Sequence, residues 1–306
     1  MSEPVATPSS NKGPRPQDLD PAALRRQARR LAQSPAPWLH AEVARRMAER
    51  LPFIKLQPRR VLDVSPALGA SAELLREAYP QAEQLWHEQP GPLQAAARGE
   101  RSPSFWQKLR GAGAAQLMAL PAVPPVDLLW SNMALHVSAD LPGQLADWQA
   151  SLAVDGFVMF SCLGPDSFVE LRPLYADVGW GRPAPDWWDM HDLGDLLVQA
   201  GFADPVMDQE RVRLTWAEPE KLLADLRALG GNLAPSRFAG LRTPRWRSQL
   251  LERLEGLRGP DGRLALTLEL VSGHALKAAP KLKVEAETRV SVDSMRQALK
   301  SGRRGP

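Results

Sequence analysis

Short runs of apolar residues alternate along this chain with segments in which apolar residues recur at helical spacing. Runs at 61–64, 126–130 and 157–161 predict buried strands, because each is bounded by polar or turn-forming residues. Between the last two runs, apolar residues step by four, three and four, as on the inner face of an amphipathic helix. They are Leu141, Leu145, Trp148 and Leu152. Strand, helix and strand in this order indicate a right-handed parallel crossover, so the sequence predicts an α/β fold with a doubly wound sheet.

Amphipathic periodicity extends to both sides of this central region. Two helices are predicted ahead of the first strand, one starting at Asp20-Pro21 and one after Pro37. They form a lid over the carboxyl end of that strand, pack on the sheet, or do both. Further helices are expected at 219–229 and 244–257. Four leucines then alternate with other residues, which predicts a half-buried antiparallel strand. They are Leu264, Leu266, Leu268 and Leu270.

The segment RRVLDVSPALGASAELL, from Arg59 to Leu75, predicts a strand, a short loop and the start of a helix. We expect Ser65 to Gly69 to form the turn and Ser71 to cap the helix. The inner face of this helix is expected to carry Leu74, Leu75 and Ala78. In open parallel α/β sheets a ligand binds where such a strand ends and its helix begins. This loop is therefore the first candidate for a binding site.

Length and composition favour an ordinary globular core. The chain has 306 residues, of which 44% are apolar. The only cysteine, Cys162, leaves no intramolecular disulfide, which suits a cytoplasmic protein. No apolar run approaches the roughly 18 residues of a membrane span. We expect a disordered lead at 1–18, one domain at 19–278 with a helical insertion at about 218–258, and a basic, flexible tail at 279–306.

The basic tail raises the question of a nucleic-acid partner. The net charge is +3 and the pI about 9.2, and Lys and Arg gather near the C-terminus. They include Lys281, Lys283, Arg289, Arg296, Lys300, Arg303 and Arg304. The tail has no aromatic residue that would stack on bases. A solvated tail is therefore favoured over one that binds nucleic acid.

Several familiar catalytic motifs are missing from the sequence. The histidines are scattered and form no metal-ligand spacing with the cysteine. They are His40, His87, His136, His191 and His274. There is neither a Gly-Lys-Ser/Thr phosphate loop nor a Gly-x-Ser-x-Gly nucleophile elbow. A metalloenzyme or a hydrolase triad therefore has no support.

Three longer segments resemble one known family. They are VDLLWSNMALH, LADWQASLAVDGFVMFSCLGPDSFVELR and WWDMHDLGDLLVQAGFADPVMDQERVRLTW, and the likeness extends from about Asp20 to Lys277. They are similar to the malonyl-acyl-carrier-protein O-methyltransferases of biotin synthesis and to mitochondrial relatives that assist the assembly of respiratory complex I. The resemblance implies a seven-stranded class I methyltransferase sheet and S-adenosylmethionine as methyl donor. It also implies a carboxyl acceptor on an acyl carrier protein, and we expect a monomer.

The same resemblance assigns roles to individual residues. Asp63 would lie beside the methionine part of the donor and Glu88, which ends a second predicted strand at 84–88, beside the ribose hydroxyls, although Glu88 could equally be a solvated turn residue. The implied donor-binding set is Asp63, Ser65, Ala67, Gly69, Glu88, Ser131 and Asn132, and the span from Asp127 to Asn132 would line the donor's edge. The implied acceptor-binding set is Gly164, Asp166, Arg172 and His191. Arg172 would hold a malonyl carboxylate by a charge-assisted fork, or form a surface salt bridge instead. No acid or base catalyst is implied, because a carboxylate is already a nucleophile and needs only alignment.

The chain departs from the family pattern around the donor. The usual Asp-x-Gly-x-Gly-x-Gly becomes Asp63-Val-Ser-Pro-Ala-Leu-Gly69, which keeps only the last glycine. A positive φ at Ser65 or Ala67 would cost roughly 1–2 kcal/mol each, and Pro66 has no N–H to offer a ligand. The acidic residue expected after the third strand is absent from 116–121, and the usual Tyr-Asp pair is absent near Ala32.

Two hypotheses about function therefore remain open. The first is an active methyltransferase with a divergent loop, which is consistent with the retained Glu88 and acceptor-side residues. The second is a non-catalytic member that keeps the fold as a binding or assembly module, since three losses converge on one ligand. Donor binding is the property that separates them.

Overall fold

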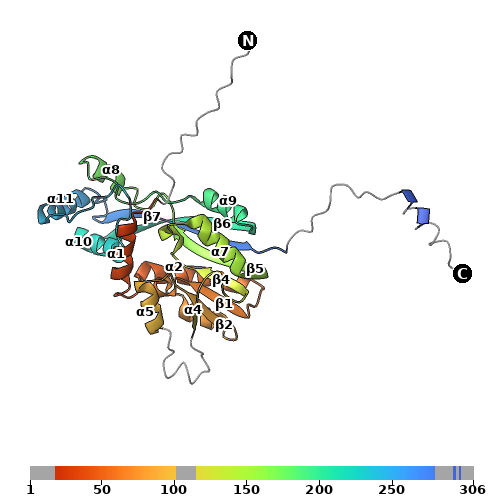
Figure 1. The fold of residues 1–306 in the computed structure, drawn as a ribbon. Helices are drawn as coiled ribbons and strands as arrows, with labels where there is room; N and C mark the ends of the chain where they lie inside the picture. The colour runs from red at the N-terminus through yellow and green to blue at the C-terminus, as the bar shows by residue number, and fades with distance from the viewer. Residues whose placement is uncertain (1–17, 101–114, 280–291, 294–295, 298–306) are drawn as a thin grey trace, which may run out of the picture.

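The computed structural model describes residues 18–100, 115–279, 292–293 and 296–297 (Figure 1). Seven strands form one sheet in the order β3-β2-β1-β4-β5-β7-β6. The first five strands in the chain pair in parallel, and β7 runs antiparallel between β5 and β6. They are β1 (Arg60–Val64), β2 (Glu83–His87), β3 (Gln116–Met118), β4 (Val126–Ser131), β5 (Leu152–Leu163), β6 (Ala203–Trp216) and β7 (Leu264–Leu276). The predicted seven-stranded, mostly parallel sheet is confirmed.

Helices cover both faces of this sheet. They are α1 (Pro21–Leu31), α2 (Trp38–Ala48), α3 (Pro66–Gly69), α4 (Ala72–Ala78), α5 (Pro92–Glu100), α7 (Leu141–Ser151), α8 (Leu171–Ala176), α9 (Met190–Gln199), α10 (Pro219–Ala228) and α11 (Pro244–Glu255), with short 3-10 turns η1 (Leu51–Phe53) and η2 (Leu135–Val137). Figure 1 shows α10 and α11 away from β1 and β2. Both helices lie in the chain between β6 and β7, where the insertion was predicted. The predicted lead at 1–18 and tail at 279–306 lie almost entirely outside the described residues.

Side-chain caps fix where several helices begin. The Asp20 carboxylate accepts from the N–H groups of Ala22 and Ala23 at the start of α1, at 2.7 and 3.1 Å. Asp140 caps α7 in the same way through Gly143. Such caps satisfy N–H groups that have no partner within the helix. The helix start predicted at Asp20-Pro21 is confirmed, and α7 lies where the apolar positions from Leu141 predicted a helix.

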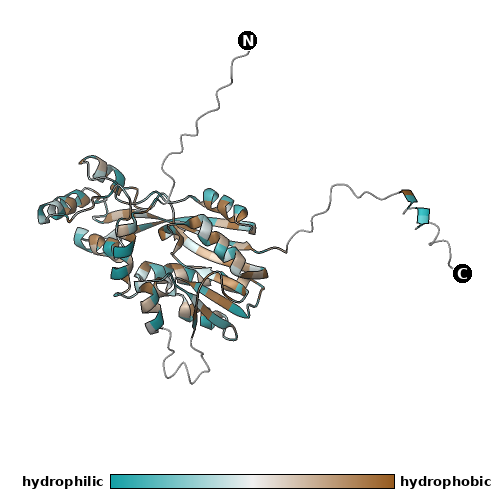
Figure 2. Ribbon diagram, in the orientation of Figure 1, coloured by the Kyte–Doolittle hydropathy of each residue, from teal (hydrophilic) through white to brown (hydrophobic). Residues whose placement is uncertain are grey.

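Alternating side chains of the central strands build one core on each face of the sheet. Val61 and Trp130 belong to the core that packs under α2 and α4, whereas Leu62 and Leu129 belong to the core under α7 and α9. This arrangement follows from the period of two along a strand. In Figure 2 the central strands are mostly hydrophobic, and the peripheral helices carry hydrophilic residues.

Three local predictions were wrong. The strand β7 is buried on both faces along most of its length, because β5 and β6 flank it and β6 is the alternating edge strand. Ala78 is exposed, and Tyr79 takes the buried position. Ser71 occupies the N-cap position of α4 but makes no cap, since its hydroxyl donates to the Gly69 carbonyl at 3.0 Å.

Candidate functional site

The carboxyl ends of β1, β2 and β4 bring three buried polar side chains together. Register places Val64 of β1 beside His87 on one side and Ser131 on the other. Asp63, Glu88 and Ser131 are each at most 1% exposed. Both carboxylate oxygens of Asp63, Oε2 of Glu88 and the Ser131 hydroxyl have no hydrogen-bond partner among the described residues. Buried polar groups normally have partners, so this edge has unmet capacity for a ligand that donates hydrogen bonds.

The two carboxyl groups are electrostatically coupled. Burial raises the pKa of Asp63 well above its ordinary value, and the nearby Glu88 raises it further, whereas Arg76 lowers it. Burial raises the pKa of Glu88 to about 7, against the opposing effect of hydrogen bonds from Ala67, Gln89 and Ser65. Burial disfavours a charged carboxylate that lacks a counter-ion. A cationic or donor-rich ligand would favour the ionised forms of both groups.

The loop after β1 is a single helical turn rather than an open turn. Ser65 has φ 65° and ψ 48°, and α3 follows directly, with Pro66 to Gly69 all buried. Ser65 thus adopts the left-handed conformation that disfavours a side chain, whereas Ala67 lies within the right-handed turn. The steric penalty predicted for these two positions therefore applies to Ser65 alone.

Residues in and next to the turn α3 already hydrogen-bond the Glu88 carboxyl group. The amide of Ala67 and the hydroxyl of Ser65 stabilise the ionised Glu88 carboxyl by hydrogen bonding, as does the amide of Gln89 at 3.3 Å. Only Oε2 of Glu88 is left without a partner among the described residues. Ser65 stands where the family pattern has glycine. Its hydroxyl therefore competes with a ligand for hydrogen bonding to Glu88.

Asn132 is fully engaged by the protein. Its Nδ2 donates to the backbone carbonyls of His40 and Gly69, both at 2.7 Å, and its Oδ1 accepts from the Ser161 hydroxyl at 2.7 Å. The Ser71 hydroxyl in turn accepts from Trp130 Nε1 at 2.7 Å. These bonds join α2, the loop after β1 and β5. Asn132 and Gly69 therefore position the loop and have little capacity left for a ligand.

Three of the predicted acceptor-side residues follow β5 in the chain, and the fourth lies in α9. Asp166 forms an ion pair with Arg211, and Arg172 donates to the Pro165 carbonyl. The Gly164 amide donates to the Glu269 carbonyl at 2.9 Å, and His191 is exposed at the start of α9. Their role in acceptor binding stays a prediction.

One residue assigned to the donor's edge is misplaced. Asp127 lies at the opposite, amino end of β4, where its carboxylate accepts from the amides of Arg59 and Arg60 at 2.8 and 3.0 Å. The predicted span from Asp127 to Asn132 therefore reaches the site only at its last residues. A strand of six residues separates its two ends too widely for both to contact one ligand part.

A cavity of about 150 Å³ that the sequence did not suggest lies beside η2, which follows β4, and the carboxyl end of β5. Its walls come from η2, the loop after β5, α8, α10 and the segment 183–187. The residues lining it include His136, Leu163, Phe168, Tyr175, Trp187, Leu223, Leu226 and Arg227. His136 lies five residues beyond the end of β4. Loops after parallel strands surround the ligand in such sheets, so this position was the available sequence signal for the cavity.

His136 is the one histidine in this cavity wall. It is 5% exposed, and its Nδ1 has no partner among the described residues. Trp187 Nε1 donates to its backbone carbonyl at 3.1 Å, and the two rings meet edge to face. Burial, with a smaller effect of His40, lowers the pKa of His136 to about 3. The ring is therefore neutral and offers a hydrogen bond without a charge.

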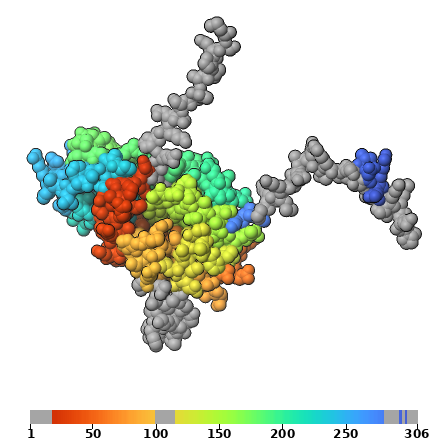
Figure 3. Space-filling view, in the orientation of Figure 1, coloured from red at the N-terminus to blue at the C-terminus, as the bar shows by residue number. Residues whose placement is uncertain are grey.

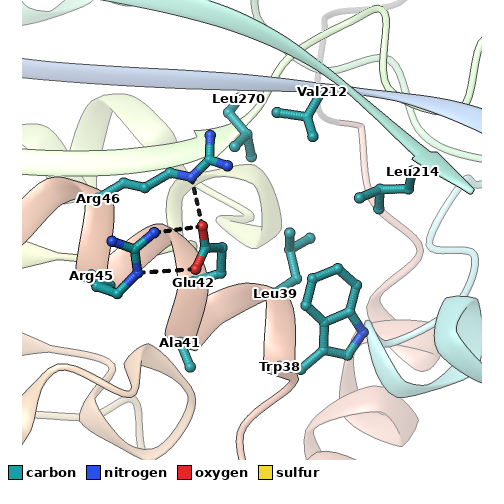
Figure 4. Close-up of a pocket in the computed structure, with 9 residues that line it drawn as sticks. All are labelled: Trp38, Leu39, Ala41, Glu42, Arg45, Arg46, Val212, Leu214 and Leu270. Atoms are coloured by element: carbon teal, nitrogen blue, oxygen red, sulfur yellow. Dashed lines mark hydrogen bonds and ion pairs between the residues drawn. The ribbon is translucent and has the colours of Figure 1, made fainter.

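A second groove, of about 510 Å³, lies between α2 and the edge of the sheet (Figure 4). Trp38 and Leu39 face Val212 and Leu214 across it. The Glu42 carboxylate accepts from Arg45 and Arg46, and Arg46 also pairs with Glu210. The charged side chains of this groove therefore form ion pairs with one another. Asp63 and Glu88, at the ends of β1 and β2, have carboxylate oxygens without a hydrogen-bond partner among the described residues. Within the described residues there is no cluster of three or more potential metal ligands.

Curated relatives match most of the chain. The malonyl-[acyl-carrier protein] O-methyltransferase of Gallionella capsiferriformans is 40% identical over 274 residues, covering 86% of this chain and 93% of that protein. Proteins of the same name from Laribacter hongkongensis and Halorhodospira halophila are 37% and 39% identical, over 80% and 78% of this chain and 85% and 80% of their own. The chain belongs to this family. The resemblance found in the sequence is thereby confirmed.

Fold comparison agrees with this membership. The crystal structure of the YcgJ protein from Bacillus subtilis matches with a TM-score of 0.51 at 10% identity, covering 76% of this chain and 98% of that one. At this identity the likeness shows the fold alone. No family model matches the sequence. No described helix has the length and apolar character of a membrane span.

Proposed function

We propose that this protein is an S-adenosylmethionine-dependent O-methyltransferase that acts on a carboxyl group of a carrier-bound acyl substrate. The proposal depends on one observation. Buried side-chain oxygen atoms of Asp63, Glu88 and Ser131 have no hydrogen-bond partner among the described residues. The donor bears an ammonium group, two ribose hydroxyls and a sulfonium charge, so it supplies donors and positive charge where the protein lacks both. The residues present fit this ligand. Several kinds of cationic ligand would suit these acceptors. The relatives are named as methyltransferases, which supports methyl transfer as the reaction.

Each residue has a distinct task in this proposal. Asp63 would accept from the ammonium group and Glu88 from a ribose hydroxyl, while Ser131 faces the same edge. Asn132 positions the loop through Gly69 and His40. The bound donor supplies an electrophilic methyl group. The protein contributes alignment and exclusion of water, because the acceptor carboxylate needs no proton removed.

The acceptor side of the proposal follows the printed names of the relatives. An acyl carrier protein loaded with a malonyl group is the partner we propose, because the relatives are named for it. The cytoplasm is the compartment we propose. Gly164, Asp166, Arg172 and His191 remain candidates for contact with this partner, since three of them lie at or near the surface. We also propose that residues 19–278 form one methyltransferase domain.

A non-catalytic role is the second candidate, and one observation favours it. The turn α3 packs its own side chains at the donor edge, and Ser65 and Ala67 already hydrogen-bond Glu88. A chain that no longer binds the donor would keep the sheet as a binding module. The relatives share the fold under either hypothesis, so they do not separate the two.

Calorimetry with S-adenosylmethionine separates the candidates. We expect binding with a Kd in the micromolar range, about −7 to −8 kcal/mol. Transfer of a labelled methyl group to malonyl-loaded carrier protein is then expected, and acetyl-loaded carrier serves as the control that lacks the acceptor carboxylate. Absence of heat at about millimolar donor would establish the non-catalytic role. Donor binding without transfer would overturn the proposed acceptor.

A further inference from the structure

Beside the end of β5 lies a buried carboxylate that the proposed function leaves without a role. Glu269 of β7 is 2% exposed, and its carboxylate accepts from the backbone amide of Asp166 and from the side-chain amide of Gln209. Both donors are neutral, and no cationic side chain in the described part of the chain forms an ion pair with Glu269. Burying a carboxylate without a counter-ion is unfavourable, and an apolar side chain of similar volume often gives equal or greater stability. Stability alone therefore does not account for a carboxylate at this position.

The backbone of Glu269 fastens the loop 164–170, which joins β5 to α8, onto β7. Its carbonyl accepts from the Gly164 amide at 2.9 Å and from the Ser167 hydroxyl at 3.1 Å, and its amide donates to that hydroxyl at 3.0 Å. A β-carbon on Gly164 would lie 2.7 Å from the Glu269 side chain, so the loop passes this close only with glycine. Figure 3 shows the green segment that contains α8 on the surface of the molecule. The loop therefore runs from the sheet to the surface, and Glu269 holds its inner half.

The same loop holds Phe168 in a backbone conformation that an aromatic residue rarely adopts. Phe168 has φ 59°, in the left-handed region, and its amide donates to the Thr267 carbonyl at 2.7 Å. Its ring meets the ring of Trp187 edge to face. The Glu170 carboxylate accepts from the Thr267 amide at 2.9 Å, which fixes the outer half of the loop to β7 as well. Such a conformation is unfavourable and persists only where the surroundings fix it, which is common at functional sites.

The loop 164–170 lies at the same edge of the sheet as the proposed donor site. β5 is the neighbour of β4, and the Ser161 hydroxyl of β5 donates to Asn132 Oδ1 at 2.7 Å. Gly164 follows Ser161 by three residues, and the loop also carries Asp166, which the resemblance placed on the acceptor side. Loops at the carboxyl ends of parallel strands surround the ligand in such sheets. A fixed loop at this place would therefore align the group that accepts the methyl.

We propose that Glu269 is a positioning residue for the methyl transfer, which holds the loop 164–170 in the shape that aligns the acceptor. The inference rests on the proposed function, because it requires an acceptor that meets this loop. Glu269 acts through the Asp166 amide and does not itself contact the substrate or the donor. Alignment is the main contribution that this reaction needs from the protein, so a small displacement of the loop slows the reaction without weakening donor binding.

The test replaces Glu269 by two residues of similar size that differ in hydrogen bonding. Glu269→Leu offers the Asp166 amide no acceptor, whereas Glu269→Gln keeps an acceptor oxygen and is the conservative variant. With saturating S-adenosylmethionine and malonyl-loaded carrier protein, we expect kcat to fall about 100-fold in Glu269→Leu and to stay within about threefold in Glu269→Gln. Donor affinity should stay within about twofold in both, and Glu269→Leu should unfold at an equal or higher temperature. Glu210→Leu, the same change at an exposed position on β6, is the matched control and should keep the wild-type kcat.

Hydrogen exchange measures the loop itself, without any substrate. Amides in 164–170 should exchange more than about tenfold faster in Glu269→Leu and at the wild-type rate in Glu269→Gln, because only leucine leaves the Asp166 amide without its partner. The proposal would be overturned by unchanged exchange or kcat in Glu269→Leu, by equal losses in both variants, or by a loss of kcat with a matching loss of donor affinity, as a merely structural role predicts. If the wild-type chain transferred no methyl group, the proposed methyl transfer would fail on its own, and the exchange rates would still decide whether Glu269 holds the loop.

Discussion

The donor edge and the His136 cavity adjoin the same sheet, yet their unpaired charges have opposite signs. At the ends of β1 and β2, Asp63 and Glu88 are buried with no described cation in ion-pair contact. Arg227 lines the cavity and Arg30 donates to its backbone carbonyl at 2.8 Å, and among the described residues neither arginine forms an ion pair with a carboxylate. Protein charges usually find partners within the chain, as those of the α2 groove do. Unpaired groups of each sign in adjoining places indicate two ligands of opposite charge, as transfer from a sulfonium donor to an anionic acceptor requires.

The largest effect is expected on donor affinity when the charge of Asp63 is removed. Asp63→Asn keeps the shape of the side chain but removes the charge that would face the donor's ammonium group. We expect donor affinity to fall about 100-fold, close to the loss of one charge-assisted hydrogen bond. Calorimetry measures the affinity. Thermal unfolding should occur at the same or a higher temperature, because a buried unpaired carboxyl is lost.

Asp127→Asn is the matched control for this substitution. The same chemical change is made in a neighbouring strand at the opposite end of the sheet, where the Asp127 carboxylate accepts from the amides of Arg59 and Arg60. Donor affinity should stay within about twofold, while stability falls by about 1 kcal/mol. Equal donor affinity in Asp63→Asn and the wild type would exclude Asp63 as a donor contact.

The next effect concerns the protonation of Glu88, whose pKa burial raises to about 7. If the ionised form accepts from the ribose, donor affinity should rise about tenfold between pH 6 and pH 8, as the ionised fraction rises from about one tenth to nine tenths. Calorimetry at several pH values measures this. Glu88→Gln should remove the part of the slope that belongs to this residue, and an unchanged slope would assign the titration elsewhere.

The free energy of unfolding should move in the opposite direction, decreasing between about pH 4.5 and pH 7. The folded protein keeps the Glu88 proton after the unfolded chain has lost it, because the folded pKa is the higher of the two. The contribution is complete below the unfolded pKa and is lost as pH rises through the folded one, a decrease of about 3 kcal/mol between roughly pH 4.5 and 7. Denaturant titrations of wild type and Glu88→Gln give this difference directly.

Local sequence predicted one of these two regions and not the other. Asp63 and Glu88 lie at or next to the ends of predicted strands, so period and parallel topology were enough to place them at one edge. The cavity is assembled from Gln27, His136, Trp187 and Arg227, which no local pattern relates. The pairing of Arg30 with Arg227 depends on how α1 packs beside α10, and such tertiary contacts have no signature in hydrophobic periodicity.

The loop shows a subtler limit of sequence reasoning. The loss of glycines suggested a shared penalty at Ser65 and Ala67, but the chain forms the turn α3 and confines positive φ to Ser65 and Ala70 on its two sides. Pro66 favours this outcome, since its fixed φ suits the first position of a helical turn. The strand β7 likewise alternates as a half-buried strand would, and only its central place in the sheet order explains burial on both faces.

The smallest expected effect sharpens the role of that loop. Ser65→Gly removes a left-handed serine and also the hydroxyl that competes for Glu88. Donor affinity should rise about fivefold, and stability should change by no more than about 1 kcal/mol, since relief of backbone strain offsets the lost hydrogen bond. Ser65→Ala keeps the strain but loses the hydroxyl, so it should raise the affinity and lower stability. Ala67→Gly, inside the right-handed turn, should leave affinity unchanged; a rise there but not in Ser65→Gly would show that the β-carbon at 67, and not the engagement of Glu88, limits the donor.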